Sequence, residues 1–182
     1  MFTIPNAVTV TRILVTPVFW YLLWSKSAVV DGTLTGLYLL LALGDAVDGI
    51  LARVLNQKSA VGSVLDPIAD KLLIVPTYFI FAVFAKLPIW LALIVVLRDM
   101  LIVIGWIVLY SKTKNLQTSP LISGKLSIIF EMLLLALLLL KFPGSVVQVV
   151  IVLTVLMIVL SFTEYVFRAV KNIGELRKGV VS

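Results

Sequence analysis

The hydrophobic residues of this chain form six long runs, separated by short segments of polar or turn-forming residues. A membrane-spanning helix needs about 20 mostly apolar residues, and each run is close to that length. The alternation of apolar and polar residues typical of a membrane β-barrel is absent from the sequence. We therefore predict an all-α integral membrane protein with six transmembrane helices: Val8–Ser25, Thr33–Arg53, Gly62–Ala85, Pro88–Tyr110, Leu121–Leu140 and Ser145–Phe167.

The composition supports a membrane protein and excludes several functional classes. Of the 182 residues, 62% are hydrophobic and only 13% are charged, whereas soluble domains have about 25% charged residues. The chain has no cysteine and no histidine, which excludes disulfides, zinc sites built on these residues and a Ser-His-Asp triad. The net charge of +6 favours anionic lipid over nucleic acid as a partner. No linker is evident, so we expect one domain over residues 1–182.

The distribution of basic residues predicts how the helices are oriented. Of the 15 basic residues, ten lie at one set of helix ends and three at the opposite set: Lys26, Lys86 and Lys141. By the positive-inside rule, both termini and the second and fourth loops face the cytoplasm. We expect the tail at Lys171–Ser182 to lie against anionic headgroups.

Acidic residues are concentrated in the apolar runs. Asp45 and Asp48 are three residues apart and share a face of the second predicted helix, while Asp66 and Asp70 are four apart and share a face of the third. Ionised carboxylates are costly inside a membrane, so such residues are functional candidates. Because a short loop joins these two helices, we expect the acidic faces to meet near the cytoplasmic end.

Four carboxylates in one pocket need either protons or cations between them, because like charges raise one another's pKa. Ligand sets made only of oxygen favour Mg²⁺ or Mn²⁺, and two such ions about 4 Å apart form a clamp for phosphoryl transfer. Small residues lie beside the acids. Gly49 and Ala52 either allow close helix packing or leave room for a flat ligand group, with Arg53 able to bind a phosphate.

Together these residues form the pattern D-x2-D-G-x2-A-R-x8-G-x3-D-x3-D over positions 45–70. The pattern resembles the signature of the CDP-alcohol phosphatidyltransferase family at all eight of its positions. Residues 4–12 resemble the amino-terminal segment of that family. Residues 66–71 are similar to its phosphatidylglycerophosphate synthase and CMP-forming cardiolipin synthase members. The resemblance implies the CDP-alcohol phosphotransferase fold and a homodimer.

The resemblance also implies individual roles and a reaction. Asp45, Asp48 and Asp66 would hold two Mg²⁺ or Mn²⁺ ions, and Asp70 would complete the metal site and act as general base. The implied contacts to CDP-diacylglycerol are Gly49, Ala52, Arg53, Ser59, Gly62, Asn6 and Thr9. In the implied reaction, the hydroxyl of an acceptor alcohol attacks the β-phosphorus of CDP-diacylglycerol and CMP leaves.

The acceptor is open at this point. Glycerol 3-phosphate is dianionic and fits a basic pocket, for which Arg98 and Lys125 are the main candidates; the weaker ones are Arg12 and Lys71. Alternatively, Arg98 forms an ion pair with Asp99 or Glu131, and Lys125 extends to the membrane interface.

Two sequence features favour different acceptors. The pair Arg98-Asp99 is more similar to CMP-forming cardiolipin synthases, whose acceptor is phosphatidylglycerol. The pair Gly124-Lys125 favours phosphatidylglycerophosphate synthases instead. Glycerol 3-phosphate is the acceptor we expect, with phosphatidylglycerol as the alternative.

A divalent-cation transporter is the alternative from another class, with the four acids as its conduction site. Two features of the pattern argue against it. Gly49 and Ala52 have no role in conducting ions, and a guanidinium at Arg53 beside a cation path would repel the ion.

Overall fold

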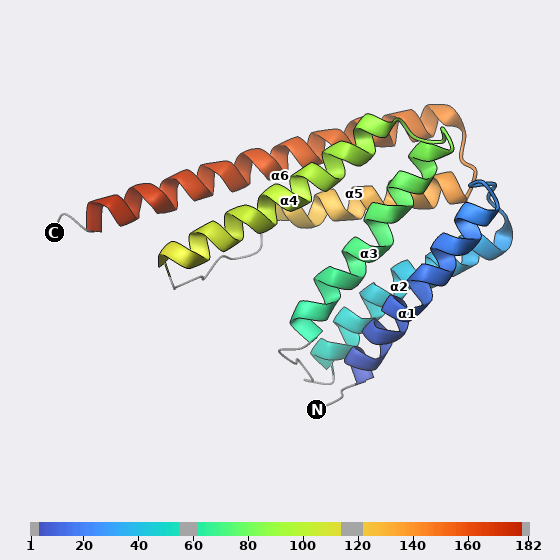
Figure 1. The fold of residues 1–182 in the computed structure, drawn as a ribbon, viewed down its shortest axis with the longest axis horizontal. Helices are drawn as coiled ribbons and strands as arrows, with labels where there is room; N and C mark the ends of the chain where they lie inside the picture. The colour runs from blue at the N-terminus through green and yellow to red at the C-terminus, as the bar shows by residue number, and fades with distance from the viewer. Residues whose placement is uncertain (1–3, 55–61, 114–121, 180–182) are drawn as a thin grey trace. The chain divides into compact units, whose positions relative to one another are not determined.

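The computed structural model describes the backbone of residues 4–54, 62–113 and 122–179, and the side chains of residues 7–44, 65, 68–104, 122–168 and 170. Across these residues the chain is helical, with no strand. The helices are α1 (Ile4–Ser25), α2 (Gly32–Val54), α3 (Gly62–Val83), α4 (Ile89–Thr113), α5 (Ile122–Leu139) and α6 (Gly144–Gly179) (Figure 1). Each corresponds to one predicted run, so the all-α fold class is confirmed.

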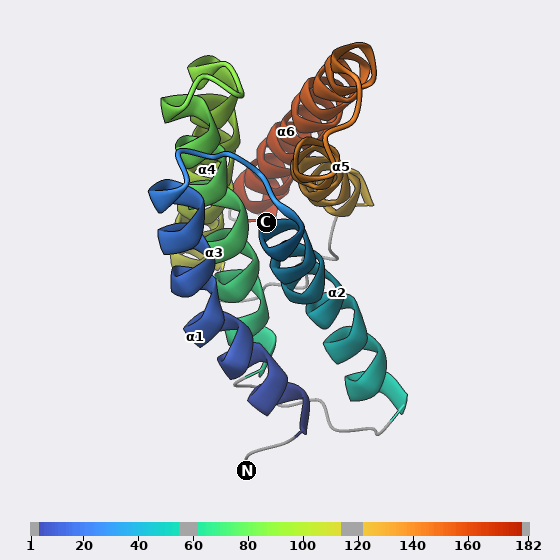
Figure 2. The ribbon, with the colours of Figure 1, turned by 90° about the vertical axis from the view of Figure 1, so that its right-hand side faces the viewer.

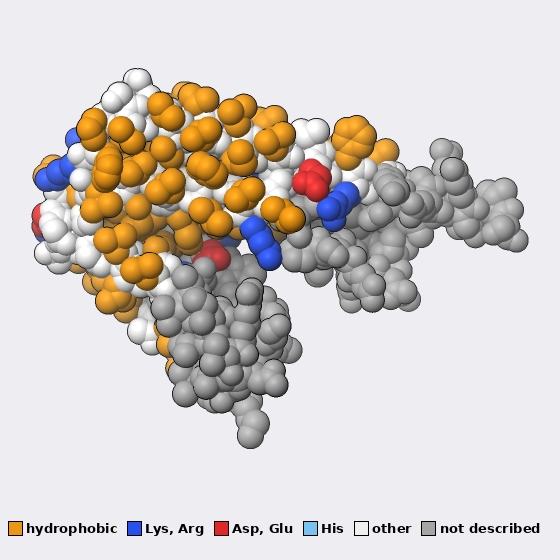
Figure 3. Space-filling view, turned by 180° about the vertical axis from the view of Figure 1, so that it is seen from behind, with side chains coloured by type: hydrophobic (Ala, Val, Ile, Leu, Met, Phe, Trp, Pro, Cys, Tyr) orange, Lys and Arg blue, Asp and Glu red, His pale blue; other side chains and the backbone are white. Residues whose placement is uncertain are grey.

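Three helices are long and apolar enough, within their described parts, to cross a membrane: Ala7–Ser25 in α1, Ile122–Leu139 in α5 and Gly144–Arg168 in α6. The segment Gly32–Gly44 of α2 is apolar but shorter. The face drawn in Figure 3 is covered mainly by hydrophobic side chains where it is described. These features indicate a membrane protein, and the crossing of the membrane by all six helices stays a prediction.

The first and last helices are longer than the apolar runs predict. Helix α1 begins at Ile4 rather than Val8. Helix α6 has 36 residues and continues past Phe167 to Gly179. No proline interrupts residues 168–179, and the segment contains good helix formers such as Leu, Arg, Lys and Glu. Hydropathy therefore underestimates a helix that continues into polar sequence.

The chain divides into two compact units. The first unit contains α1, α2, α3, the first turn of α4 and the end of α5 (Met1–Ala92 and Leu135–Pro143). The second unit contains most of α4 and α5 together with α6 (Leu93–Leu134 and Gly144–Ser182). The single domain over residues 1–182 stays a prediction.

In the first unit, α1 packs against both α2 and α3, whereas α2 and α3 meet over only a short stretch of described residues (Figure 2). The core includes Phe19 and Tyr38, whose ring centroids are 6.0 Å apart, and the buried Leu23, Leu73 and Phe81. Helices α1 and α3 run in one direction and α2 runs in the other (Figures 1 and 2). The start of α1, the end of α2 and the start of α3 therefore lie at one end of this unit.

Asp31 caps the amino-terminal end of α2. Its carboxylate accepts a hydrogen bond from the backbone N–H of Leu34 at 2.9 Å, as is typical of an N-cap residue. Its other oxygen is bonded to Nζ of Lys26. The bond from Lys26, followed by the bond from Leu34, lowers the pKa of Asp31 below its ordinary value.

Helices α3 and α5 are each followed, two residues after the last helical residue, by a left-handed residue that is not glycine. Ala85 and Lys141 each have a φ of 55°. After α3, the N–H of Lys86 donates to the carbonyl of Phe81 at 2.8 Å, which is the bond of a Schellman ending. Glycine is usual at this left-handed position because a Cβ makes the conformation less favourable.

Candidate functional site

The acidic residues of the signature lie on helical backbone. Asp45 and Asp48 are in α2, and Asp66 and Asp70 are in α3. Residues three or four apart in a helix share a face, and the shared faces of these two pairs stay a prediction. The side chain of Asp70 is described, and the other three carboxylates lie outside the described side chains.

Arg12 of α1 joins α2 and α3 beside the signature. Its Nη2 donates a hydrogen bond to Oδ1 of Asp70 at 3.1 Å, and its Nε donates to the carbonyl of Leu41 at 2.9 Å. The side chain of Arg12 is 4% exposed and that of Asp70 is 17% exposed. A guanidinium buried to this degree needs polar partners. Here the partners come from two different helices.

The side chain of Arg12 lies against the backbone of α2 at Gly44, the residue before Asp45. A Cβ built on Gly44 would lie 3.1 Å from Cδ of Arg12 and 3.6 Å from its Cγ. Carbon atoms in favourable contact are about 3.5–4.0 Å apart. The lack of a side chain at position 44 therefore allows Arg12 to reach Leu41 and Asp70.

The contacts of Arg12 show where the acidic positions lie relative to one another along α2 and α3. Arg12 reaches α2 just before Asp45 and α3 at Asp70. Asp48 lies three residues further along α2, and Asp66 lies four residues back along α3. Because the helices are antiparallel, both steps lead toward the same end of the unit, by about 4.5 and 6 Å. The backbone of all four acidic positions thus lies in the half of the unit that contains the end of α2 and the start of α3.

The donor chemistry of the signature fits a hard divalent cation. All four acidic positions are aspartates, and Mg²⁺ and Mn²⁺ prefer such oxygen ligands. Among the side chains that the structure describes, no group of three or more His, Cys, Asp or Glu could hold a metal. That finding does not test the predicted metal site, because three of its four carboxylates are not among those side chains.

The predicted CDP-diacylglycerol contacts are described only in part. Those with a described backbone but no described side chain are Gly49, Ala52 and Arg53 in α2, Gly62 at the start of α3, and Asn6 in α1. Ser59 lies outside the described residues. Thr9 is described, and it is buried in α1, three residues before Arg12.

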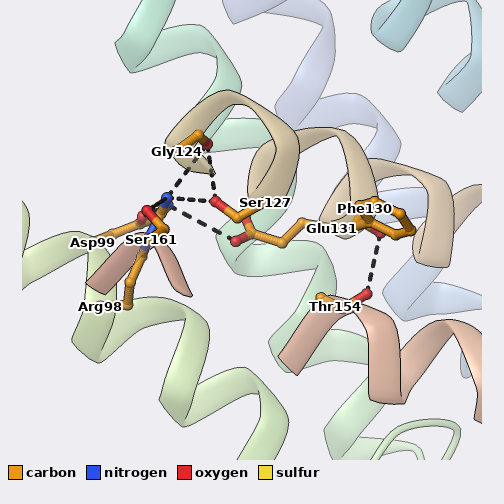
Figure 4. Close-up of polar contacts among 8 residues, drawn as sticks. All are labelled: Arg98, Asp99, Gly124, Ser127, Phe130, Glu131, Thr154 and Ser161. Atoms are coloured by element: carbon orange, nitrogen blue, oxygen red, sulfur yellow. Dashed lines mark hydrogen bonds and ion pairs between the residues drawn. The ribbon is translucent and has the colours of Figure 1, made fainter. Parts of the chain in front are cut away.

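In the second unit, Arg98 of α4 is the centre of a polar cluster (Figure 4). Its Nη1 lies 2.8 Å from Oδ1 of Asp99 and 3.8 Å from Oε1 of Glu131. Its Nη2 donates to the hydroxyls of Ser127 in α5 and Ser161 in α6. Arg98 therefore links three helices, and it forms the ion pairs that we considered as the alternative to acceptor binding.

Lys125 is exposed on α5, in the same unit as Arg98. The preceding residue, Gly124, accepts a hydrogen bond from Nη2 of Arg98 through its carbonyl at 3.4 Å. The hydroxyl of Ser123 donates to Oε2 of Glu164 in α6 at 2.6 Å. Acceptor binding by Arg98 and Lys125 stays a prediction.

The structure pairs Arg12 with Asp70 and shows two serines beside Arg98 that the sequence does not predict. We rank Arg12 from the sequence as a weak acceptor-binding candidate, whereas its side chain binds Asp70. A signal for this pairing exists, because a basic residue in an apolar helix usually needs an acidic partner. The sequence carries no comparable signal for Ser127 and Ser161, because their approach to Arg98 depends on helix packing.

Comparison with known sequences yields a family and several relatives. The profile of the family described as CDP-alcohol phosphatidyltransferase matches residues 2–162. A rat protein named cardiolipin synthase (CMP-forming) is 38% identical over 117 residues, which cover 64% of this chain and 37% of that protein. A Bacillus subtilis protein named CDP-diacylglycerol–glycerol-3-phosphate 3-phosphatidyltransferase is 33% identical over 111 residues, covering 54% of this chain and 58% of that protein.

A relative from Aquifex aeolicus with the same name as the Bacillus protein matches along nearly the whole of both chains. It is 28% identical over 178 residues, which cover 93% of this chain and 97% of that protein. By contrast, the match spans only 37% of the rat protein. The matched region, residues 2–162, contains the whole signature together with Arg12 and Gly44. The chain belongs to the CDP-alcohol phosphatidyltransferase family.

Proposed function

We propose that this protein transfers the phosphatidyl group of CDP-diacylglycerol to an alcohol and releases CMP. The observation that carries the proposal is the complete signature on α2 and α3 in a member of the CDP-alcohol phosphatidyltransferase family. The contacts of Arg12 support it. Arg12 contacts α2 at Gly44, next to Asp45, and α3 at Asp70, so Asp45 and Asp70 lie at about the same height along the two helices.

The acceptor that we favour is glycerol 3-phosphate, which would give phosphatidylglycerophosphate. The relative that matches nearly the whole of both chains is named for transfer to this acceptor. Phosphatidylglycerol is the alternative, because a relative of higher identity is named cardiolipin synthase. Arg98 and Lys125 are the proposed contacts to the acceptor. Lys125 is the more accessible of the two, since Arg98 is buried and ion-paired.

Asp45, Asp48, Asp66 and Asp70 are the proposed ligands of two divalent ions, Mg²⁺ or Mn²⁺. When bound, such ions would neutralise the charge of the donor's diphosphate. The proposed contacts to the rest of CDP-diacylglycerol are Gly49, Ala52, Arg53, Ser59, Gly62, Asn6 and Thr9.

Asp70 is the proposed general base. The acceptor's hydroxyl oxygen forms a bond to the β-phosphorus, the bond from that phosphorus to the oxygen of CMP breaks, and the carboxylate of Asp70 takes the hydroxyl proton. Such a base has to lie within hydrogen-bond reach of the hydroxyl and keep its orientation. The bond from Arg12 gives Asp70 a defined orientation.

The membrane setting suits a lipid donor, whose diacyl tails can stay in the bilayer while the nucleotide reaches water. We further propose that all six helices span the membrane, that both termini and the signature face the cytoplasm, and that the protein is a homodimer. The excess of basic residues at one set of helix ends supports this orientation.

The transferase is favoured over a cation transporter. The chain belongs to a family of transferases, and Gly49 and Ala52 of the signature have no role in conducting ions.

The test is release of CMP by the purified protein in detergent with Mg²⁺ and CDP-diacylglycerol. The acceptors to compare are glycerol 3-phosphate, phosphatidylglycerol, inositol phosphate and serine. We expect Mg²⁺-dependent release with glycerol 3-phosphate. Release with phosphatidylglycerol alone would establish the alternative acceptor. No release with any of them, together with metal flux into liposomes, would overturn the transferase.

A further inference from the structure

We infer that Arg12 is a positioning residue that holds the carboxylate of Asp70 for the transfer reaction, and that position 44 is glycine so that Arg12 can do so. The inference rests on the proposed function, in which Asp70 is the general base. It assigns Arg12 a role through Asp70 and no contact with substrate.

Among the described residues, Arg12 makes two hydrogen bonds to other helices, and these define the orientation of its guanidinium. Nε is held by the carbonyl of Leu41 at 2.9 Å, and Nη2 reaches Oδ1 of Asp70 at 3.1 Å. These donors belong to one planar, rigid group, so the backbone of α2 determines where Nη2 points. The carboxylate on α3 is thereby aligned to a fixed point on α2. A lysine has a single ammonium group and cannot make both bonds in this geometry.

The burial of the pair makes this alignment stable. With 4% exposure for Arg12 and 17% for Asp70, water competes little for either group. Screening by salt is also weaker for buried pairs than for exposed ones. The carboxylate is therefore held in place before substrate binds.

Gly44 offers a second, independent way to disturb Arg12. A methyl group at this position would lie 3.1 Å from Cδ of Arg12. Since Nε and Nη2 are both bonded, moving Cδ away from this methyl group would disturb those bonds. Gly36, two turns earlier on the same helix, is a matched control, because a Cβ there meets nothing within 4 Å.

The experiment compares Arg12→Gln, Arg12→Lys, Gly44→Ala, Gly36→Ala and the double variant Arg12→Gln/Gly44→Ala. The kinetic readouts are kcat for CMP release and KM for CDP-diacylglycerol. The structural readout is the thermal unfolding midpoint in detergent without added metal. In addition, the unfolding midpoints of Asp70→Asn, Arg12→Gln and the variant with both substitutions are compared in a double-mutant cycle. This comparison can be made even if the protein shows no activity.

A misplaced catalytic group lowers kcat more than substrate binding. We expect Arg12→Gln to lower kcat by about 10–100-fold with little change in KM, and Arg12→Lys to restore only part of the loss. Gly44→Ala should lower kcat by about 3–10-fold, whereas Gly36→Ala should leave it unchanged. The double variant should be no slower than Arg12→Gln, because the methyl group then has no arginine to displace.

The inference is overturned if Gly44→Ala and Gly36→Ala have the same kcat, or if the effects of Arg12→Gln and Gly44→Ala multiply. If Arg12→Gln folds poorly, the inference can still be tested, because the comparison of kcat between Gly44→Ala and Gly36→Ala does not depend on that variant. A wild type that releases no CMP overturns the proposed function instead. The double-mutant cycle then decides the inference: Arg12 holds Asp70 only if Asp70→Asn shifts the unfolding midpoint less in the Arg12→Gln background.

Discussion

The guanidinium of Arg98 lies 3.8 Å from the carboxylate of Glu131, and the two side chains are 5% and 0% exposed. The pair joins α4 to α5, and Asp99 adds a second carboxylate at 2.8 Å. Charges this far from water are stable only with partners of the opposite sign. Arg98 is therefore a major structural contact of the second unit, whether or not it also binds an acceptor.

Replacing Arg98 with leucine should destabilise the protein strongly. The change removes a positive partner of Glu131 and Asp99, and breaking a buried ion pair in this way costs about 3–5 kcal/mol. Thermal unfolding in detergent measures the loss. Arg168→Leu is the matched control, because the pair Arg168–Glu164 is 51% and 42% exposed and such pairs contribute about 0–1 kcal/mol. Equal losses in the two variants would contradict a structural role for Arg98.

Replacing Ala85 with glycine should stabilise the protein. Ala85 follows α3 and has a φ of 55°, a conformation that costs a residue with a Cβ about 1 kcal/mol relative to glycine. We expect a higher unfolding midpoint for Ala85→Gly. Ala82→Gly lies inside α3 and should lower the midpoint, because glycine in a helix costs about 1 kcal/mol. A fall in both variants would contradict the left-handed ending of the helix.

The contribution of Asp31 to stability should depend on pH. The bonds from Lys26 and from the N–H of Leu34 lower its pKa in the folded state. Its contribution is therefore complete above the unfolded-state pKa of about 3.9 and is lost as the pH falls through the lower folded-state value. Asp31→Asn keeps a capping side chain but does not titrate. The difference in unfolding midpoint between wild type and Asp31→Asn should shrink below about pH 4, and a constant difference would contradict this role.

Replacing Asp66 with alanine should remove the response to metal. In the wild type, Mg²⁺ binding to the folded state should raise the unfolding midpoint as its concentration increases. We expect Asp66→Ala to lose this rise and to lose CMP release, while its midpoint without metal stays near that of the wild type. If Asp66→Ala kept the Mg²⁺-dependent rise in unfolding midpoint and normal turnover, Asp66 would not be a metal ligand.

The helices could be predicted from the sequence because apolar runs determine where a chain can cross a membrane. Each of the six helices corresponds to one run, and the spacing of Asp45, Asp48, Asp66 and Asp70 indicates which residues share a helix face. Hydropathy does not determine where α6 ends, since helix formation continues into polar residues after Phe167.

The pairing of side chains between helices was harder to predict. Arg12 could have bound an acceptor, a headgroup or an acid, and only the packing of α1 against α2 and α3 places it beside Asp70. The close contact at Gly44 likewise depends on this packing, because glycine in an apolar helix can serve several purposes. For Arg98, the sequence allowed two interpretations, acceptor binding and an ion pair. The structure shows the ion pair together with two serine contacts.

The central claim is that aspartates from α2 and α3 form one catalytic site for transfer from CDP-diacylglycerol. Its most direct test is the rate of Mg²⁺-dependent CMP release by the wild type and by Asp70→Asn, with glycerol 3-phosphate and with phosphatidylglycerol. Asp31→Asn serves as the control for loss of a carboxylate outside the signature. We predict rapid release by the wild type and by Asp31→Asn, and a loss of at least about 100-fold in Asp70→Asn. Release by Asp70→Asn at the wild-type rate would contradict the claim.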